Sequence, residues 1–195
     1  DGVVSAGGAL QALPRLAGQV PHLAVFRALV VVRERVERGR ARQREHRARG
    51  EEPHHLTGDV HVAPGRVQGL EAGAYYHHPE RHTLVRISDA GPIDPGLHSP
   101  PNRTMFERSA FSLFLVCDRR AIEPLYGEKW RDFALLEAGL MSQLLELRAA
   151  EQQLGLCQVG ELRFEPLRAA FRLEEQHVYL HSLLGGGLVW EEGSL

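Results

Sequence analysis

The stretch from Tyr126 to Gly160 reads YGEKWRDFALLEAGLMSQLLELRAAEQQLGLCQVG, and its pattern predicts one long helix over Arg131 to Ala150. Residues three and four positions apart share one face of a helix. The apolar or amide side chains spaced in this way are Phe133, Leu136, Leu140, Gln143, Leu144 and Leu147. Further apolar residues widen that surface, namely Leu135, Met141, Leu145 and Ala149. A helix that is apolar over so much of its circumference must be covered, so we expect either a large core or a homodimer built on this helix.

The ends and the interior of this helix are also marked in the sequence. Asp132 lies near the start, where a carboxylate interacts favourably with the helix dipole, and Gly155 follows the last turn as an expected stop. Gly139 in the interior costs about 1 kcal/mol relative to alanine, so we expect another element to pack closely against it. The residues from Gly155 to Glu161 are expected to form a loop.

Length, composition and charge limit the possible classes of protein. The chain has 195 residues, 43% of them hydrophobic, which is enough for one domain with its own core. The net charge of -2 argues against a nucleic-acid partner, and no apolar run is long enough to predict a membrane span. Cys117 and Cys157 lack metal-ligand spacing and indicate a reduced, cytoplasmic protein. The Arg-rich segment Arg33 to Arg49 is expected to be a solvated helix or a disordered tail, with a phosphate-binding basic arm as the alternative.

Short apolar runs between turn residues predict an α+β sandwich rather than a doubly wound fold. The expected strands are Val60–Val62, Gly73–His77, Thr83–Ile87, Phe111–Asp118 and His177–Leu183. The sequence further predicts a long loop over Ser88–Arg103, a break over Pro124–Gly127, a short helix over Glu165–Phe171, and a flexible exit at Gly185–Gly187.

Three histidines, His77, His78 and His82, lie on either side of a proline turn. Zinc sites combine histidines with cysteines or carboxylates at regular spacing, and no such set completes this group. We therefore expect a turn-exposed group of histidines and no metal site.

Several segments in succession resemble one family. They are PGRVQGLEAGAYYHHPERHTL, PPNRTMFERSAFSLFL, AIEPLYGEKW, the long helix with LGLCQVG after it, and the terminal HVYLHSLLGG. Together they resemble the oxidase domains of the nitroreductase-like, FMN-dependent superfamily. The likeness is to the domains embedded in nonribosomal peptide synthetases and to the SagB-type azoline dehydrogenases. It covers about Val60 to Gly187.

This resemblance implies a nitroreductase-like sandwich, with an antiparallel or mixed sheet covered by helices and a dimer that holds FMN at its interface. The implied reaction oxidises a thiazoline or oxazoline of a carrier-protein-tethered peptidyl substrate to a thiazole or oxazole, next to neighbouring synthetase domains. By position, Cys157, Gln158, Val159 and Gly160 match the loop that lies against the flavin ring in this superfamily. A glycine in such a loop lets backbone N–H groups approach the ring closely. The alternative is an ordinary stop after the helix.

Tyr126 and Lys129 are the candidate catalytic residues. Oxidation of an azoline needs a base for the ring proton, and a lysine or tyrosine with a lowered pKa can act as one. Related azoline oxidases use a Lys/Tyr pair, although its spacing differs from Tyr-x-x-Lys in this sequence. The alternative is that Lys129 faces water at the start of the helix.

The first 58 residues depart from the family pattern. Relatives begin with a segment that grips the FMN phosphate, followed by a Ser-Ala-Gly loop before the first strand, and neither motif is present at its place. We therefore expect an atypical N-terminal segment over residues 1–58 that is poorly ordered or read out of frame. A truncated flavin domain over 59–187 and a tail over 188–195 would follow it. The alternative function is an inactive remnant that serves as a structural or docking module.

Overall fold

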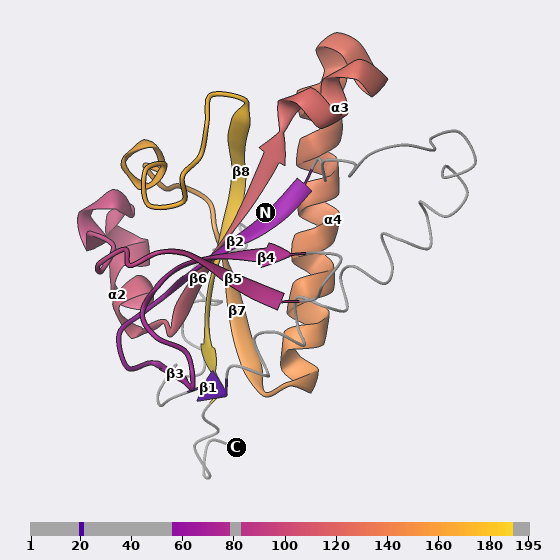
Figure 1. The fold of residues 1–195 in the computed structure, drawn as a ribbon. Coiled ribbons are helices and arrows are strands. Elements are labelled where there is room, and N and C mark those ends of the chain that lie inside the picture. The colour runs from indigo at the N-terminus through magenta and orange to yellow at the C-terminus, as the bar shows by residue number, and fades with distance from the viewer. Residues whose placement is uncertain (1–19, 22–55, 79–82, 189–195) are drawn as a thin grey trace.

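The computed structural model describes residues 20–21, 56–78 and 83–188, which form one antiparallel sheet with helices on both faces (Figure 1). The six strands lie in the order β5-β4-β2-β6-β8-β7, and each pairs antiparallel with its neighbours. Their bounds are β2 Leu56–Val62, β4 Gly73–His78, β5 Thr83–Ser88, β6 Phe111–Asp118, β7 Leu154–Val159 and β8 His177–Gly187. A separate pair of short strands, β1 Val20–Pro21 and β3 Val67–Gln68, runs parallel. The α+β class predicted from the sequence is confirmed.

Strand β6 is the centre of the sheet. All eight of its residues, FSLFLVCD, are buried, because β2 and β8 pair with its two edges and other layers cover its two faces. A strand buried on both faces has apolar residues at nearly every position. This composition is the reason why the strand was predicted with its correct bounds.

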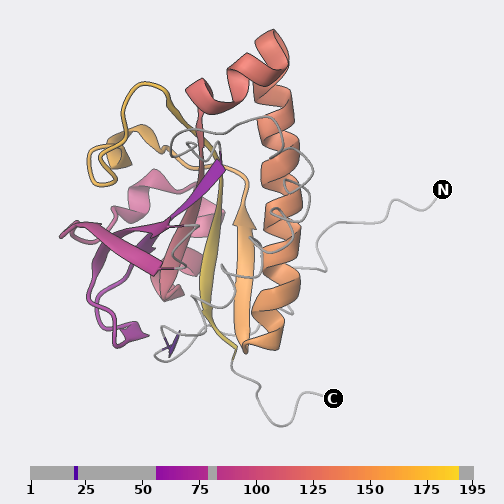
Figure 2. The same ribbon diagram turned by 45° about the vertical axis from the view of Figure 1, so that its right-hand side comes forward.

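One face of the sheet is covered by α4, the 22-residue helix Trp130–Glu151 (Figure 2). The residues that α4 buries are all small except for one leucine. They recur at helical spacing: Ala134, Ala138, Ser142, Leu145 and Ala149. The Ser142 hydroxyl donates to the Ala138 carbonyl at 2.8 Å, so this buried polar group is satisfied within the helix. The small side chains let the helix backbone approach the sheet closely.

The larger apolar residues of α4 lie on its outer side. Leu136 and Leu140 are 64% and 68% exposed, and Leu147 is exposed as well. The spacing therefore identified an apolar face correctly, but that face points away from the sheet of its own chain. The expected close packing against Gly139 is wrong within this chain, since a Cβ built there meets no atom within 4 Å. Gly139 lies among the exposed leucines.

Two glycine-containing segments differ from expectation because they are strands. The predicted loop Gly155–Glu161 is mostly β7, which pairs with β8 over its full length. The predicted flexible exit Gly185–Gly187 is the end of β8. At Gly185 a Cβ would lie 2.1 Å from the Phe111 ring across the β6–β8 pair, so the absence of a side chain makes room for that ring.

Helices and short turns fill most of the remaining chain. The expected long loop contains the 3-10 turn η3 Pro95–Leu97 and the helix α2 Pro100–Arg108. The helix α3 Arg119–Tyr126 includes Pro124 rather than ending before it, and Gly127, with a φ of 54°, ends it. The turn η4 Gly127–Lys129 then leads into α4. The expected helix Glu165–Phe171 is reduced to the 3-10 turn η5 Glu165–Leu167 and further turns.

The second face of the sheet is covered less regularly. Figure 2 shows α2 and the loop around η5 on the side opposite α4. Their contacts with the sheet form an aromatic cluster in which Phe114 of β6 packs against Phe164 and Phe171, with ring centroids 5.3 and 5.2 Å away. Most of the predicted N-terminal segment 1–58, with its poor order or shifted frame, lies outside the described residues. Within it, residues 20–21 and 56–58 are described, in strands β1 and β2. No helix in the described part is long and apolar enough to cross a membrane.

Candidate functional site

The predicted flavin-ring residues lie at the end of β7. Cys157, Gln158 and Val159 are the last residues of this strand, and Gly160 follows as an exposed bend. β7 is an edge strand of the described sheet, so its second backbone edge faces no strand there. The Gln158 side-chain oxygen lies 3.1 Å from His181 Nε2 on β8, which fixes the Gln158 side chain across the two strands.

This strand end has the features that a flat ring requires. A Cβ built at Gly160 meets nothing within 4 Å, so the space on the side-chain side of this residue is open. Edge-strand N–H groups are unpaired donors in a fixed direction. Burial and the nearby Glu146 carboxylate raise the pKa of the Cys157 thiol, which makes Cys157 a packing residue rather than a reactive thiolate. The end of β7 therefore fits the ring portion of a flavin through backbone donors.

Two of the basic side chains that follow β7 bind the protein backbone. Arg163 Nη2 donates to the Gly96 carbonyl at 2.7 Å, and Arg168 Nη1 donates to the His177 carbonyl at 2.9 Å. These contacts pin the loop around η5 to the rest of the domain. A flavin phosphate would therefore need basic groups other than these two.

Tyr126 and Lys129 lie at the corner between α3 and α4. Both are exposed, and the Tyr126 ring stacks on Phe133 with 4.3 Å between centroids. Both residues precede α4, whereas β7 begins after α4 ends. A 22-residue helix is roughly 33 Å long and a six-residue strand returns roughly 17 Å of that length. Within one chain, the structure does not bring the candidate base next to the candidate ring site (Figure 1).

The histidine group is not arranged as expected. His77 is buried on β4 and His78 is partly buried, so the expected exposure is wrong for His77, whereas His82 lies outside the described residues. His77 is buried because it lies on the same face of β4 as Tyr75, which belongs to the core under α4. Among the residues that the structure describes, no cluster of histidine, cysteine and carboxylate side chains could hold a metal ion.

A row of polar residues on β2 was missed by sequence reasoning. Val60 and Val62 belong to the core under α4, and side chains alternate between the faces of a strand. Thr57, Asp59 and His61 therefore face the second side of the sheet. The strand was expected to begin only at Val60, so this alternation was not recognised. The string LTGDVHV contains the signal, with a polar residue at every second position.

Burial shifts the pKa values of two members of this row. His61 is buried, its Nε2 lies 3.0 Å from the Gly91 carbonyl oxygen, and burial lowers its pKa. Asp59 is 2% exposed, and burial raises the pKa of its carboxyl to about 7. Strongly shifted groups of this kind are common at functional sites.

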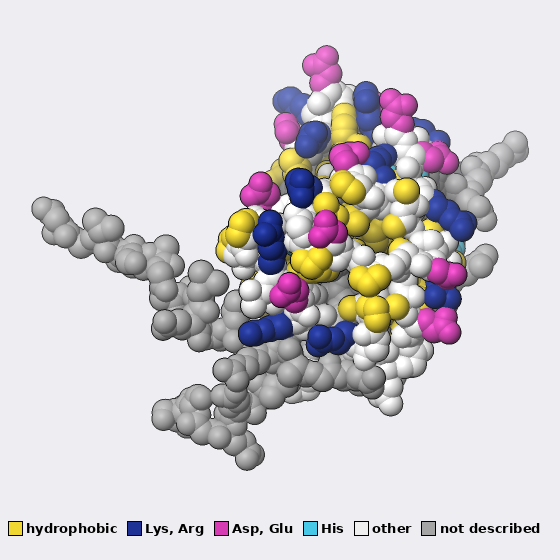
Figure 3. Space-filling model, turned by 90° about the vertical axis from the view of Figure 1, so that its left-hand side faces the viewer, with side chains coloured by type: hydrophobic (Ala, Val, Ile, Leu, Met, Phe, Trp, Pro, Cys, Tyr) yellow, Lys and Arg dark blue, Asp and Glu magenta, His cyan; other side chains and the backbone are white. Residues whose placement is uncertain are grey.

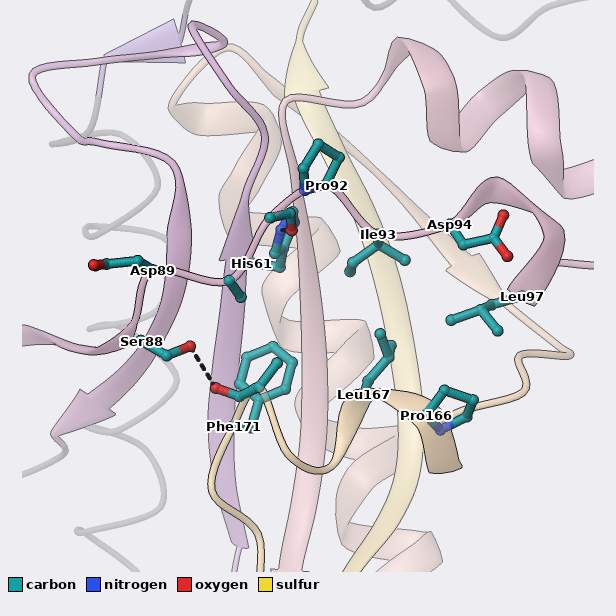
Figure 4. A pocket seen from close by; sticks show the side chains of 13 residues that line it. His61, Ser88, Asp89, Pro92, Ile93, Asp94, Leu97, Pro166, Leu167 and Phe171 are labelled. Carbon is teal, nitrogen blue, oxygen red and sulfur yellow. Dashed lines mark hydrogen bonds between the residues drawn. The ribbon is translucent and has the colours of Figure 1, made fainter.

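The polar row borders three pockets on the second face of the sheet. Figure 4 shows one of them, with His61 on the sheet, Phe171 from the turns after η5, and Asp94 and Leu97 at η3. Its volume is about 730 Å³. The Ser88 hydroxyl donates to the Ala170 carbonyl at 2.7 Å and ties the two sides of this pocket together. A second pocket, of about 470 Å³, is lined by Asp59. Figure 3 shows apolar side chains near the middle of the face on the α2 side, with charged side chains around them.

Comparisons with known proteins agree with this architecture. A model of the nitroreductase family matches residues 26–186, which extends further towards the N-terminus than the likeness seen from Val60. The chain is 28% identical over 120 residues to the indigoidine synthase of Dickeya dadantii, covering 62% of this chain and 7% of that protein. It is 27% identical over 123 residues to MJ1384 of Methanocaldococcus jannaschii, which is named as a nitroreductase, covering 63% and 62% of the two chains. The matched region thus spans less than two thirds of either relative.

Solved structures support the fold. A chain of the Escherichia coli microcin synthetase McbBCD complex, solved with truncated pro-MccB17 bound, superposes with a TM-score of 0.67 at 14% identity. That match covers 97% of this chain and 75% of the other. A structure from Anabaena variabilis assigned to the nitroreductases gives a TM-score of 0.65 at 18% identity, covering 88% and 35%. At these identities the likeness concerns the fold alone, whereas the family model matches more than half of the sequence. The chain belongs to the nitroreductase family.

Proposed function

We propose that this chain is an FMN-dependent oxidase domain that converts a thiazoline or oxazoline of a carrier-bound peptidyl intermediate to the thiazole or oxazole. The observation that carries the proposal is the match to a small part, 7%, of a synthase. The match to a small part of a long protein agrees with the resemblance to oxidase domains that are embedded in nonribosomal peptide synthetases and are related to the SagB-type dehydrogenases. The fold relative in a synthetase complex with a bound pro-peptide supports a peptide-derived substrate. Neighbouring synthetase domains are the proposed partners.

FMN is the proposed cofactor, since members of the nitroreductase family typically bind it. The end of β7 is the proposed ring site, with open space beside Gly160 and Gln158 held by His181. When bound, FMN would accept the hydride from the azoline and pass two electrons to oxygen. Arg163 and Arg168 are bound to carbonyl groups, so the proposal assigns the phosphate to neither of them.

The protein must supply the base that takes the second hydrogen as a proton. Tyr126 and Lys129 remain our candidates for that role. Because they lie far along α4 from the end of β7 in the same chain, we place them next to the ring site of a second protomer. Tyr126 is held by its stacking on Phe133, and Lys129 is exposed and can approach a bound substrate. The proposed site is therefore shared between two copies of the chain.

A homodimer through the outer face of α4 is the proposed assembly. Monomeric proteins rarely leave a contiguous apolar patch of this kind in water. Leu136, Leu140 and Leu147 are exposed on this face, with Gly139 between them where a second backbone can approach. The double substitution Leu136→Asp and Leu140→Asp should convert a dimer into a folded monomer in sedimentation velocity. Leu125→Asp, which changes an exposed leucine of α3 instead, should leave the dimer intact. A wild-type monomer at all concentrations would refute this assembly.

Flavin content and turnover test the proposal directly. The purified chain should be yellow, release FMN on heating, and convert a thiazoline peptide thioester to the thiazole with formation of hydrogen peroxide. Lys129→Gln and Tyr126→Phe should keep FMN and lose turnover by about 100-fold or more, the usual contribution of a general base. Arg131→Gln, a neighbouring exposed cation, should behave as wild type. Turnover unchanged in both variants would exclude them as the base.

The second candidate function is an inactive remnant that serves as a docking module between synthetase domains. It is favoured by one observation, that two of the three arginines after β7, Arg163 and Arg168, are bound to backbone carbonyls. Colourless protein that takes up no added FMN, yet still folds and dimerises, would support this function over the oxidase.

A further inference from the structure

A second pocket, of about 470 Å³, lies on the sheet face opposite α4 and away from the end of β7. Its floor is formed by Thr57 and Asp59 of β2 and Tyr76 of β4, with Asp59 and Tyr76 directly opposite each other across the strand pair. Phe171 and Leu173, from the turns after η5, form an apolar wall. The proposed oxidase function assigns no role to this pocket.

The carboxylate of Asp59 is the unusual group in this pocket. Asp59 is 2% exposed, and within the described part of the chain its side chain forms no hydrogen bond or ion pair. Asp118, which lines the same pocket, has the opposite environment. It accepts from the Arg120 backbone N–H at 3.0 Å and pairs with the Arg120 guanidinium at 3.1 Å. Burial of a carboxylate without a partner is costly unless it is protonated or finds a cation.

The remaining charges of the pocket decide what kind of partner fits. Arg86 is already engaged by Glu71 at 2.7 Å and by Asp89 at 3.2 Å, so it is not available to neutralise Asp59. Arg172 lies exposed at the rim, in the left-handed region with a φ of 51°. A ligand that fits this pocket would therefore place a cation next to Asp59. Its apolar part would lie against the apolar wall, and the positive charge of Arg172 would lie at the pocket entrance.

We propose that this pocket binds a small aliphatic amine, with the ligand's ammonium group paired to the Asp59 carboxylate and its carbon chain against Phe171 and Leu173. A buried ion pair of this kind satisfies both partners and explains why an acid is placed in the floor. A free α-amino acid belongs to the same chemical class, because its ammonium would reach Asp59 while its carboxylate stays near Arg172. The proposal does not depend on FMN.

Three probes of similar size test the pairing in the full-length chain, by calorimetry or NMR titration at pH 8. Butylamine has the ammonium, pentanoate has a carboxylate in its place, and norvaline has both. Butylamine and norvaline should bind and pentanoate should not. A tighter norvaline would identify an amino acid as the ligand, and equal affinities would identify a simple amine. Pentanoate that binds as tightly as butylamine would overturn the proposal.

Asp59→Asn is the matching variant, since it keeps the shape of the side chain and removes its charge. It should weaken butylamine binding at least tenfold, whereas Asp132→Asn, which removes an exposed charge on α4, should leave the affinity unchanged. Unchanged binding in Asp59→Asn would overturn the proposal.

Proton linkage gives a readout that needs no variant. The other titratable groups in this pocket are Tyr76, Arg86, Asp118, Arg172 and His177. Since the pKa of Asp59 lies at about 7, the ionised fraction of its carboxyl rises about tenfold between pH 6 and pH 8. Butylamine affinity should rise by about the same factor. In carboxyl carbon NMR of the wild type, saturating butylamine should lower the pKa of Asp59, and an unchanged pKa would refute the pairing even if the variant failed to fold.

Discussion

The two faces of the six-stranded sheet are covered in different ways. One face lies under the single helix α4, and its buried centre is apolar, with Val60, Leu113, Leu115 and Leu183 packed together there. The other lies under the short helix α2 together with turns and loops, and there Asp59, His61 and Ser112 are buried beside aromatic rings. Strands β2 and β6 contribute side chains to both faces. The faces differ in polarity because successive side chains along each strand point to opposite faces, and the polar ones point away from α4.

This difference assigns separate tasks to the two faces. A long helix with small inner residues excludes water along its whole length and leaves no room for a ligand. Turns such as η3 and η5 cover a sheet incompletely, and pockets of about 730 and 470 Å³ remain beside the polar row of β2. The α4 face accordingly stabilises the fold, and the opposite face offers binding sites.

Adjacent residues of β6 give the largest test of this comparison, because Phe114 and Leu115 are both fully buried and belong to opposite cores. Phe114→Ala should lower the free energy of unfolding by about 3–5 kcal/mol and Leu115→Ala by about 2–5 kcal/mol. Phe114 is the cross-strand partner of Asp59, so its truncation should also admit water and lower the pKa of Asp59. Leu115→Ala should leave that pKa unchanged. Denaturant titration and carboxyl NMR measure the two effects, and equal pKa values in both variants would contradict the division between faces.

The pH dependence of stability gives the next largest effect. The carboxyl of Asp59 has a pKa of about 7 in the folded state against an ordinary value of 3.8, so the folded chain binds this proton more tightly than the unfolded chain. The free energy of unfolding should therefore fall as the pH rises from about 4 to about 7. The whole loss amounts to roughly 4 kcal/mol at most. Asp59→Asn should remove this loss and be more stable than wild type at pH 8, while the two agree near pH 4.

Denaturant titrations from pH 4 to pH 8 measure the difference between the two profiles. Asp132→Asn, an exposed carboxylate of α4, should keep the wild-type profile. Parallel profiles for wild type and Asp59→Asn would mean that the carboxyl is solvated or paired in solution.

The elements of the α4 face were largely predictable from sequence, and those of the opposite face were not. The all-apolar string of β6 and the helical spacing of α4 are strong local signals. What the spacing could not decide is which side of α4 meets the sheet. Alanine and serine, which score weakly in any apolar pattern, form the inner side, while the leucines lie outside. The choice depends on how closely helix and sheet approach, which is a tertiary property.

The candidate site was predicted only in part for the same reason. Cys157 to Gly160 were singled out, but two glycines in seven residues indicated a loop where cross-strand pairing with β8 makes a strand. The row Thr57, Asp59 and His61 was missed because polar residues at alternate positions normally indicate a solvent face. Here another layer buries that face. The role of the β7 residues and of Tyr126 and Lys129 stays a prediction.

A glycine of β8 provides a smaller test on the α4 side of the comparison. In Gly185→Ala the new methyl group would lie 2.1 Å from the Phe111 ring, so the ring must move within a buried environment. Overpacking of this kind costs about 1–3 kcal/mol. At Gly160, where a Cβ meets nothing within 4 Å, the same substitution should leave stability nearly unchanged. Thermal unfolding of the two variants compares them, and equal losses would mean that the β6–β8 contact is looser than described.

The smallest expected effect concerns the turn η3, which frames the larger pocket on the second face. The Asp94 carboxylate accepts from the Gly96 N–H at 2.8 Å and caps this turn. Asp94→Ala should cost about 1 kcal/mol or less of global stability, because the cap is exposed. Its local effect should be larger, with faster amide exchange at Gly96 and Leu97. Asp89→Ala, which removes another exposed carboxylate from the same pocket, should leave exchange in η3 unchanged. If both variants accelerated exchange equally, the pocket wall would be held by the charge of the whole segment rather than by the cap. The second face would then depend on electrostatics where the first depends on packing.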